Sequence, residues 1–192
     1  MKRNFYLLMS LFGFLVACSP STKITKSWTD PSWKQADTAL FKKVLVVCPL
    51  KSESSRRFAE DKLVASIKKM VAVQSYNYLK SSDSVQNERE EKLKKDGFDC
   101  IILMRLVVVD KNLSYTPGTP YGGWYGYSYS TPGYYSEDRT FYVETDFYSL
   151  AQKKLIWSAT TSTLNPTQLD KTLNEIIVAV KTELTKKGLI KQ

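Results

Sequence analysis

A continuous apolar run from Val44 to Val47 is the feature that most constrains the fold of this chain. A strand with no polar face is typically buried on both sides, as in sheets that are covered by helices. A capping stretch, Ser52 to Ser55, follows the strand, and a helix is predicted over about 55–69. Its apolar stripe is Ala59, Leu63, Ile67 and Met70, spaced four, four and three.

Further strands and helices follow in an order that extends the same sheet. The predicted elements are a strand at 71–76, a helix at 85–96, strands at 98–109, 140–150 and 155–163, and a helix that Asn165-Pro166 opens with Asn as its cap. The order is therefore β-α-β-α-β-β-β-α. We predict an α+β fold (α/β sandwich), with a mixed sheet of about five strands and helices packed on it.

Composition shifts divide the chain into three parts. Residues 1–17 form a leader, residues 18–38 a lipid-anchored tether, and residues 39–192 a single α/β domain. Asp30-Pro31-Ser32 in the tether is turn chemistry. The flanking Trp28 and Trp33 predict that the tether packs back onto the domain, or alternatively that it offers a surface contact.

The first residues have the pattern of an export leader. Lys2-Arg3 precedes an apolar stretch, Phe5 to Ala17, that is shorter than the ~20 residues a membrane-spanning helix needs. It ends in Leu15-Val16-Ala17-Cys18, which resembles the lipobox of bacterial lipoproteins. The resemblance implies cleavage before Cys18, a diacylglycerol on its sulfur and acylation of the new amino group. An ordinary leader with a chance cysteine is the alternative. Ser19 replaces the Asp that often signals inner-membrane retention, which favours the outer membrane and a domain facing the periplasm.

Charge and residue usage limit the chemistry. The chain carries a formal net charge of +9 and no His, which excludes Ser-His and Cys-His catalysis and the commonest transition-metal ligand. We expect no cofactor and no metal site. The basic surface either sits near anionic lipid or peptidoglycan or only solvates the domain, and nucleic acid does not suit an exported protein. Cys48 and Cys100 fall on strands that, if parallel neighbours, hold them several residues apart in register, so we expect two buried free thiols.

A Tyr/Gly-rich insert at 111–139 is the first candidate site. We expect an irregular segment there, and it holds seven of the twelve Tyr. Aromatic rings with polar tips on a Gly/Pro backbone make an adaptable surface for sugars, peptides or proteins. The candidate contact residues are Trp124, Tyr125, Tyr127 and Tyr129. The alternative is a hairpin insert that binds nothing.

A charged trio is the second candidate. Arg105 lies in the middle of a predicted strand, and Glu144 and Asp146 share a face of another. If the two strands are antiparallel neighbours, a structural cross-strand ion pair is the natural interpretation, and a metal site or an acid–base pair is the alternative.

Two short patterns carry a family resemblance. One is the lipobox followed by the Trp28 to Trp33 segment. The other is the step from Lys43-Val44-Leu45-Val46-Val47 to Arg56-Arg57-Phe58-Ala59-Glu60-Asp61, with Ser75-Tyr76 in the next strand. Together with the insert they resemble small bacterial envelope lipoproteins with domains of unknown function, and the Lys-rich composition and leader resemble those of Bacteroidota. The element order is also similar to that of the curli-secretion lipoprotein and of the amino-terminal domain of the Tol-system propeller protein.

These resemblances supply no catalytic residue, since a shared fold does not fix a function. We predict a membrane-anchored lipoprotein that acts as a periplasmic binding or envelope-assembly module, and the absence of His and of a nucleophile motif argues against an enzyme. Its expected partners are the membrane, through the lipid on Cys18, and another envelope protein or cell-wall glycan. A cell-wall-acting enzyme and a purely structural envelope protein are the alternative classes.

Overall fold

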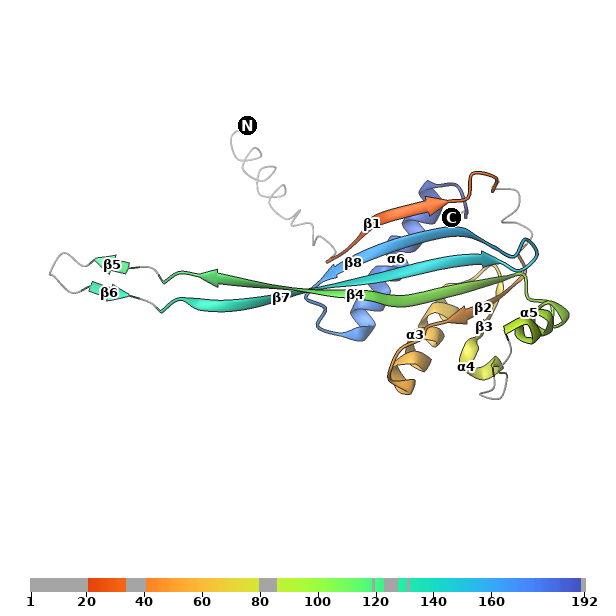
Figure 1. Ribbon diagram of the computed structural model, residues 1–192, viewed down its shortest axis with the longest axis horizontal. Helices are drawn as coiled ribbons and strands as arrows, with labels where there is room; N and C mark the ends of the chain where they lie inside the picture. The colour runs from red at the N-terminus through yellow and green to blue at the C-terminus, as the bar shows by residue number, and fades with distance from the viewer. Residues whose placement is uncertain are drawn as a thin grey trace, which may run out of the picture.

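The protein folds into a mixed sheet with helices packed on it, which is the predicted class (Figure 1). The computed structural model describes residues 21–33, 41–79, 86–118, 120–122, 128–130 and 132–190. The six strands of the main sheet run in the order β1-β8-β7-β4-β2-β3 and are β1 (Thr22–Thr29), β2 (Lys43–Val47), β3 (Val71–Gln74), β4 (Cys100–Thr116), β7 (Tyr134–Ser149) and β8 (Lys154–Leu164). The helices are α3 (Glu53–Ser66), α4 (Ser75–Tyr78), α5 (Gln86–Lys95) and α6 (Leu169–Lys186).

Strand β2 is buried on both faces, as its continuous apolar run predicts. It pairs in parallel with both β3 and β4, while the other strands of the sheet pair antiparallel. Val46 packs into the cluster under α3 and α6, and Leu45 packs on the opposite face with Leu93 of α5 and Phe98. The sheet therefore has a helix layer on each face at this end.

A buried carboxylate ties α3 to the sheet. Glu60 is fully buried and accepts hydrogen bonds from Arg56 Nε (3.2 Å), Ser75 Oγ (2.7 Å) and the backbone N–H groups of Cys48 and Tyr76 (both 3.1 Å). The sequence predicts the Arg56–Glu60 ion pair from its i,i+4 spacing, but not its burial. These bonds also explain why the strand predicted to reach Tyr76 ends at Gln74 and turns into α4.

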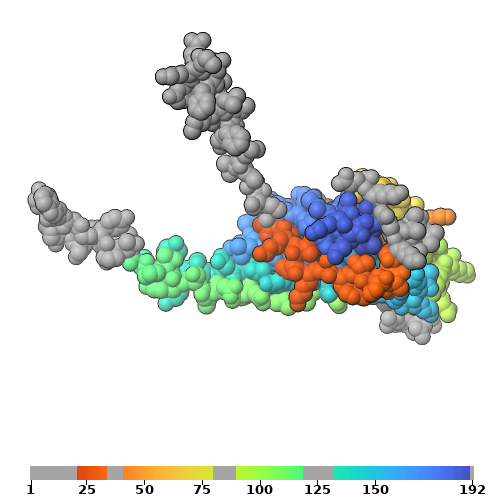
Figure 2. Space-filling view, turned by 90° about the horizontal axis from the view of Figure 1, so that it is seen from above, coloured from red at the N-terminus to blue at the C-terminus, as the bar shows by residue number. Residues whose placement is uncertain are grey.

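The sixth strand is a correction to the predicted count of about five. It is β1, which lies inside the segment 18–38 that we expected to be a tether. It pairs antiparallel with β8, with a bulge between Ile24 and Lys26. Figure 2 shows β1 at the surface beside the C-terminal part of the chain. Residues Thr22 to Thr29 therefore belong to the domain itself.

The insert at 111–139 is also more regular than we expected. β4 continues to Thr116 and β7 begins at Tyr134, and the two strands stay paired along their whole length, with a shift between Leu106 and Val108. The pair extends as a two-stranded ribbon well beyond the body of the protein (Figures 1 and 2). A small second sheet, β5 (Pro120–Gly122) with β6 (Ser128–Ser130), lies at its end.

The last helix begins later than its sequence pattern predicts. It starts at Leu169, after Gln168, and not at Asn165-Pro166. Asn165 has φ +45° and ends the sheet instead, because its Oδ1 accepts a hydrogen bond from Arg139 N and its Nδ2 donates to Asp138 Oδ1, both 2.8 Å. The side chain of Asn165 therefore caps the end of strand β8 and not the start of the helix.

The two described cysteines are free and buried, as predicted. Val44 pairs with Cys100 between the parallel strands β2 and β4, so Cys48 lies further along the sheet. Burial raises the pKa of both thiols to about 12. Since the thiolate is the reactive form, neither cysteine is a nucleophile at neutral pH.

Candidate ligand-binding cleft

Most residues of the first candidate site fall outside the described part of the chain. Cys18, Trp124, Tyr125 and Tyr127 are not among the described residues. Tyr129 lies in β6, opposite Tyr121 of β5. The structure thus fixes the ribbon that leads to these residues.

The second candidate, the charged trio, lies where β4 and β7 pair. Arg105 is directly opposite Glu144, and its Nη2 and Nε lie 2.7 and 3.1 Å from Glu144 Oε2. Arg105 Nη2 is 3.8 Å from Asp146 Oδ2. The hydrogen bonds that Arg105 donates to Glu144 raise the pKa of Arg105, while burial raises the pKa of Asp146. The geometry is that of a cross-strand ion pair on the sheet, and no group of three or more metal-ligating side chains occurs among the described residues.

A site that was not predicted lies on the opposite face of the sheet. It is an open cleft of about 610 Å³ between α3, α6 and the sheet, within the ~300–1,000 Å³ typical of ligand pockets. Leu63 and Ile67 line it from the end of α3. Its floor comes from β4 and β7, and its other wall from α6, as follows: Ile102 and Met104 of β4, Thr145 and Phe147 of β7, and Ile177, Val180 and Leu184 of α6.

The cleft exists because α3 is shorter than α6. Lys62 of α3 pairs with Asp170 near the start of α6, and Lys181 Nζ of α6 donates to the carbonyl of Ser66, 2.6 Å away, where α3 ends. The two helices therefore lie side by side in the same direction. Beyond Ser66 the chain turns extended at Ile67, whereas α6 continues to Lys186. Among the described residues, no second helix covers the apolar surface of the sheet beside this last part of α6.

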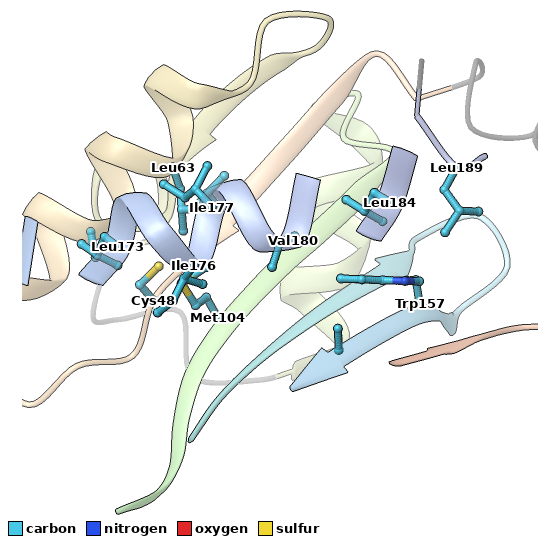
Figure 3. Close-up of a cluster of buried hydrophobic side chains, with 13 residues drawn as sticks. Cys48, Leu63, Met104, Trp157, Leu173, Ile176, Ile177, Val180, Leu184 and Leu189 are labelled. Carbon is cyan, nitrogen blue, oxygen red and sulfur yellow. The ribbon is translucent and has the colours of Figure 1, made fainter. Parts of the chain in front are cut away.

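Figure 3 shows how the apolar side chains divide around α6. Leu63 and Ile177 approach each other between the two helices, while Val180 and Leu184 point toward the sheet. Leu173 and Ile176 lie in the first half of α6, near Cys48 and Met104. They belong to the buried cluster and do not line the cleft. The same helix therefore closes a core at one end and forms the wall of a cleft at the other.

Lysines surround the mouth of the cleft. Lys68 and Lys69 follow α3, and Lys181 and Lys186 belong to α6; all four are exposed. No Asp or Glu lies among the described residues that line the cleft. Lysine stems can cover apolar surface while their ammonium groups stay in water. The cleft is thus apolar inside and positively charged at its rim.

The carboxylates of α6 are engaged away from the cleft. Asp170 pairs with Lys62. Glu175 accepts hydrogen bonds from Ser21 Oγ (2.6 Å) and Thr22 Oγ1 (2.9 Å), which lower its pKa. Glu183 accepts one from Ser27 Oγ (2.7 Å). Glu175 and Glu183 are therefore hydrogen-bonded to β1 and the residue before it, and the lysines determine the charge at the mouth of the cleft.

One polar group lies on the floor. Thr145 is 1% exposed, and its Oγ1 has no hydrogen-bond partner within the described ranges. Buried hydroxyls are nearly always hydrogen-bonded, and an exception points to a strained site, a water or a ligand. Besides the lysines at the rim, the polar lining residues are Ser66, Thr145, Thr182 and Thr185, and the rest of the lining is apolar.

Sequence patterns did not reveal this cleft, because its residues have the same spacing as a helix core. Leu63, Ile67 and Met70 were expected on one buried stripe of a helix that runs to residue 69. Lys68 and Lys69 lie off that stripe on a helical projection, so the spacing gives no sign that the helix ends at Ser66.

Comparisons with known proteins give only distant likenesses. No protein-family model and no curated protein matches the sequence. The PelC dodecamer from Paraburkholderia phytofirmans aligns with 89% of this chain and 99% of its own, at 11% identity and a TM-score of 0.42. Lipoprotein GNA1162 from Neisseria meningitidis aligns with 76% and 99%, at 12% identity and a TM-score of 0.40. At these values the likeness assigns neither a family nor a function to the chain.

Proposed function

We propose that this chain is a lipid-anchored protein of the bacterial envelope whose domain binds an apolar ligand in the cleft between α3 and α6. The observation that carries the binding function is the cleft itself, an apolar space of about 610 Å³ on a rigid sheet. The anchor rests on the lipobox at Cys18, and Ser19 supports the outer membrane and a periplasmic domain. Two or more acyl chains give stable attachment, since each buried methylene contributes ~0.8 kcal/mol.

Binding suits the cleft better than catalysis does. Its described lining offers apolar surface, hydroxyl groups and ammonium groups, without a carboxylate or thiol. General acid–base and nucleophilic catalysis both need a group that titrates or attacks near neutral pH. We therefore propose a binding module and not a cell-wall-acting enzyme. No helix in the described ranges is long and apolar enough to cross a membrane.

The ribbon supports a second contact, with another envelope protein or a cell-wall glycan. The ribbon of β4 and β7 extends away from the body (Figure 1), and Trp124, Tyr125 and Tyr127 lie between these two strands in the sequence. A photo-crosslinking residue at Tyr125 in living cells should give one discrete adduct. A smear from every insert position, or no adduct, would refute this contact.

The anchor is tested by replacing the acylated residue. Cys18→Ser should release the chain from the membrane fraction and abolish its labelling by a metabolic fatty-acid probe, whereas Cys48→Ser should change neither. Cys48 is the matched control because it is a buried thiol far along the chain. Unchanged labelling of the Cys18→Ser chain would rule out the proposed lipid attachment.

The ligand site is tested by photolabelling. The full chain is purified from membranes, placed in phosphatidylcholine vesicles and irradiated with a neutral, diazirine-bearing long-chain alcohol. Adducts should concentrate in peptides that line the cleft, around residues 63–70, 102–104 and 177–190.

Two threonines of α6 provide a matched pair of variants. Thr182 lines the cleft and Thr172 does not, yet each donates a hydrogen bond of 2.8 Å to the carbonyl four residues before it. Thr182→Trp should reduce cleft labelling at least ~10-fold by obstructing the mouth, while Thr172→Trp should leave it unchanged. Equal labelling of the two variants, or adducts spread evenly over the surface, would refute the site.

A further inference from the structure

We propose that the ligand of the cleft is a single-chain amphiphile with an anionic head group, a carboxylate or a phosphate on one acyl chain. This inference rests on the proposed binding function and specifies its ligand class. Two independent features of the cleft carry it: the shape and chemistry of the interior, and the sign of the charge at the rim.

The interior fits an acyl chain. Methylene groups gain free energy from contact with apolar side chains and need no directional partner. Met104 and Phe147 on the floor, and Ile177 and Leu184 on the wall, provide such a surface. The volume suits one chain, because pockets of this size hold one ligand of roughly drug size.

The rim fits an anion. Four ammonium groups surround the mouth, and the carboxylates of α6 are held by Lys62 and by β1. On α3, Glu60 is buried in its own network and Asp61 accepts from Tyr76 Oη (2.6 Å). A head group at the mouth therefore meets positive charges and no competing carboxylate among the described lining residues.

The helix ends oppose this charge but do not cancel it. Both α3 and α6 end near the cleft, and each C-terminus carries roughly −0.5 of an elementary charge. Lys181 offsets this at α3 by donating to the carbonyl of Ser66, and Lys186 lies in the last turn of α6. Lys68 is exposed at the mouth in addition to these two lysines, so the rim stays positive.

An amphiphile supplies both parts that the cleft requires. Its apolar chain matches the interior, and its anionic head group matches the lysines at the rim.

The experiment compares head groups on one chain. The full chain in phosphatidylcholine vesicles is photolabelled with two probes that share the diazirine-bearing chain of the neutral alcohol, one ending in a carboxylate and one in a trimethylammonium group. The carboxylate should label the cleft peptides about 10-fold more strongly, as expected for two or more ion pairs of up to ~1 kcal/mol each. Raising the salt concentration should weaken this preference.

Lysine variants locate the preference. Lys68→Gln combined with Lys186→Gln should remove most of it while the neutral alcohol still labels the cleft. Lys23→Gln combined with Lys26→Gln removes the same charge from exposed positions on β1 and should leave the preference intact.

The outcomes separate the two proposals. If the neutral alcohol labels the cleft but both charged probes label it equally, or if both double variants behave alike, the anionic ligand class is wrong and the binding site stands. If the neutral alcohol does not label the cleft, the binding site fails and the ligand class fails with it.

Discussion

The two ends of the space between α3, α6 and the sheet are made of similar residues but differ in packing. At one end Leu173 and Ile176 of α6 lie near Cys48 (Figure 3), in the buried cluster that also includes Ala59. At the other, Ile177 and its neighbours border the cleft. We call these the closed end and the open end. The difference comes from the point at which α3 stops, so a helix boundary, and not the apolar pattern, determines where a ligand site forms.

Polar anchors differ between the two ends in the same way. Glu60 at the closed end is fully buried and has four hydrogen-bond donors. Lys181 at the open end is exposed and makes one bond, to the carbonyl of Ser66. Burial makes the first anchor costly to break, whereas water can replace the second.

The largest expected effect is therefore at Glu60. Glu60→Ala should destabilise the protein by about 3–5 kcal/mol, because it leaves Arg56 and several buried donors without their acceptor. Lys181→Met should cost no more than ~1 kcal/mol. Urea unfolding of the full chain, followed by tryptophan fluorescence, measures both. Similar losses at the two residues would show that the open end is anchored as firmly as the closed end.

A pair of adjacent isoleucines tests packing alone. Ile176 is 2% exposed and belongs to the closed end, while Ile177 is 8% exposed and lines the cleft. Ile176→Ala should cost about 3–5 kcal/mol and Ile177→Ala about 2 kcal/mol, since the second deletion enlarges a space that already exists. Urea unfolding measures the cost of both substitutions. Because the substitution and the helix are the same, the difference between the two costs reports the packing around each side chain. Equal costs would indicate that the open end is packed as tightly as the closed one in solution.

The closed end is largely predictable from sequence. The apolar run at Val44 to Val47 and the spacing of Leu173 and Ile176 are those of a buried strand and a buried helix face, and both depend on local spacing. On the other face of the sheet, the pairing of Arg105 with Glu144 was expected if their strands were antiparallel neighbours, and the strand register places the two residues opposite each other.

The cleft and the edge elements are not predictable in this way. Strand β1 has a bulge after Ile24 that breaks its alternation, and the ribbon from Leu106 onward is exposed on its β4 side, so neither shows a steady apolar period. The cleft depends on where α3 ends relative to α6, which is a tertiary relation. Helix ends are set by capping and by tertiary contacts such as the hydrogen bond from Lys181 to the carbonyl of Ser66. The spacing of apolar residues in the sequence does not reveal such contacts.

The smallest expected effect concerns two buried threonines on neighbouring strands. Thr145 on the cleft floor has an unpartnered hydroxyl, while Thr161 is fully buried and donates to the carbonyl of Val143 (3.1 Å). Thr161→Val should lose about 1 kcal/mol, the net worth of a typical hydrogen bond, whereas Thr145→Val should be neutral or stabilising by up to ~1 kcal/mol. Urea unfolding without added ligand measures both. A loss at Thr145 that equals the loss at Thr161 would mean that the Thr145 hydroxyl is already satisfied in the free protein.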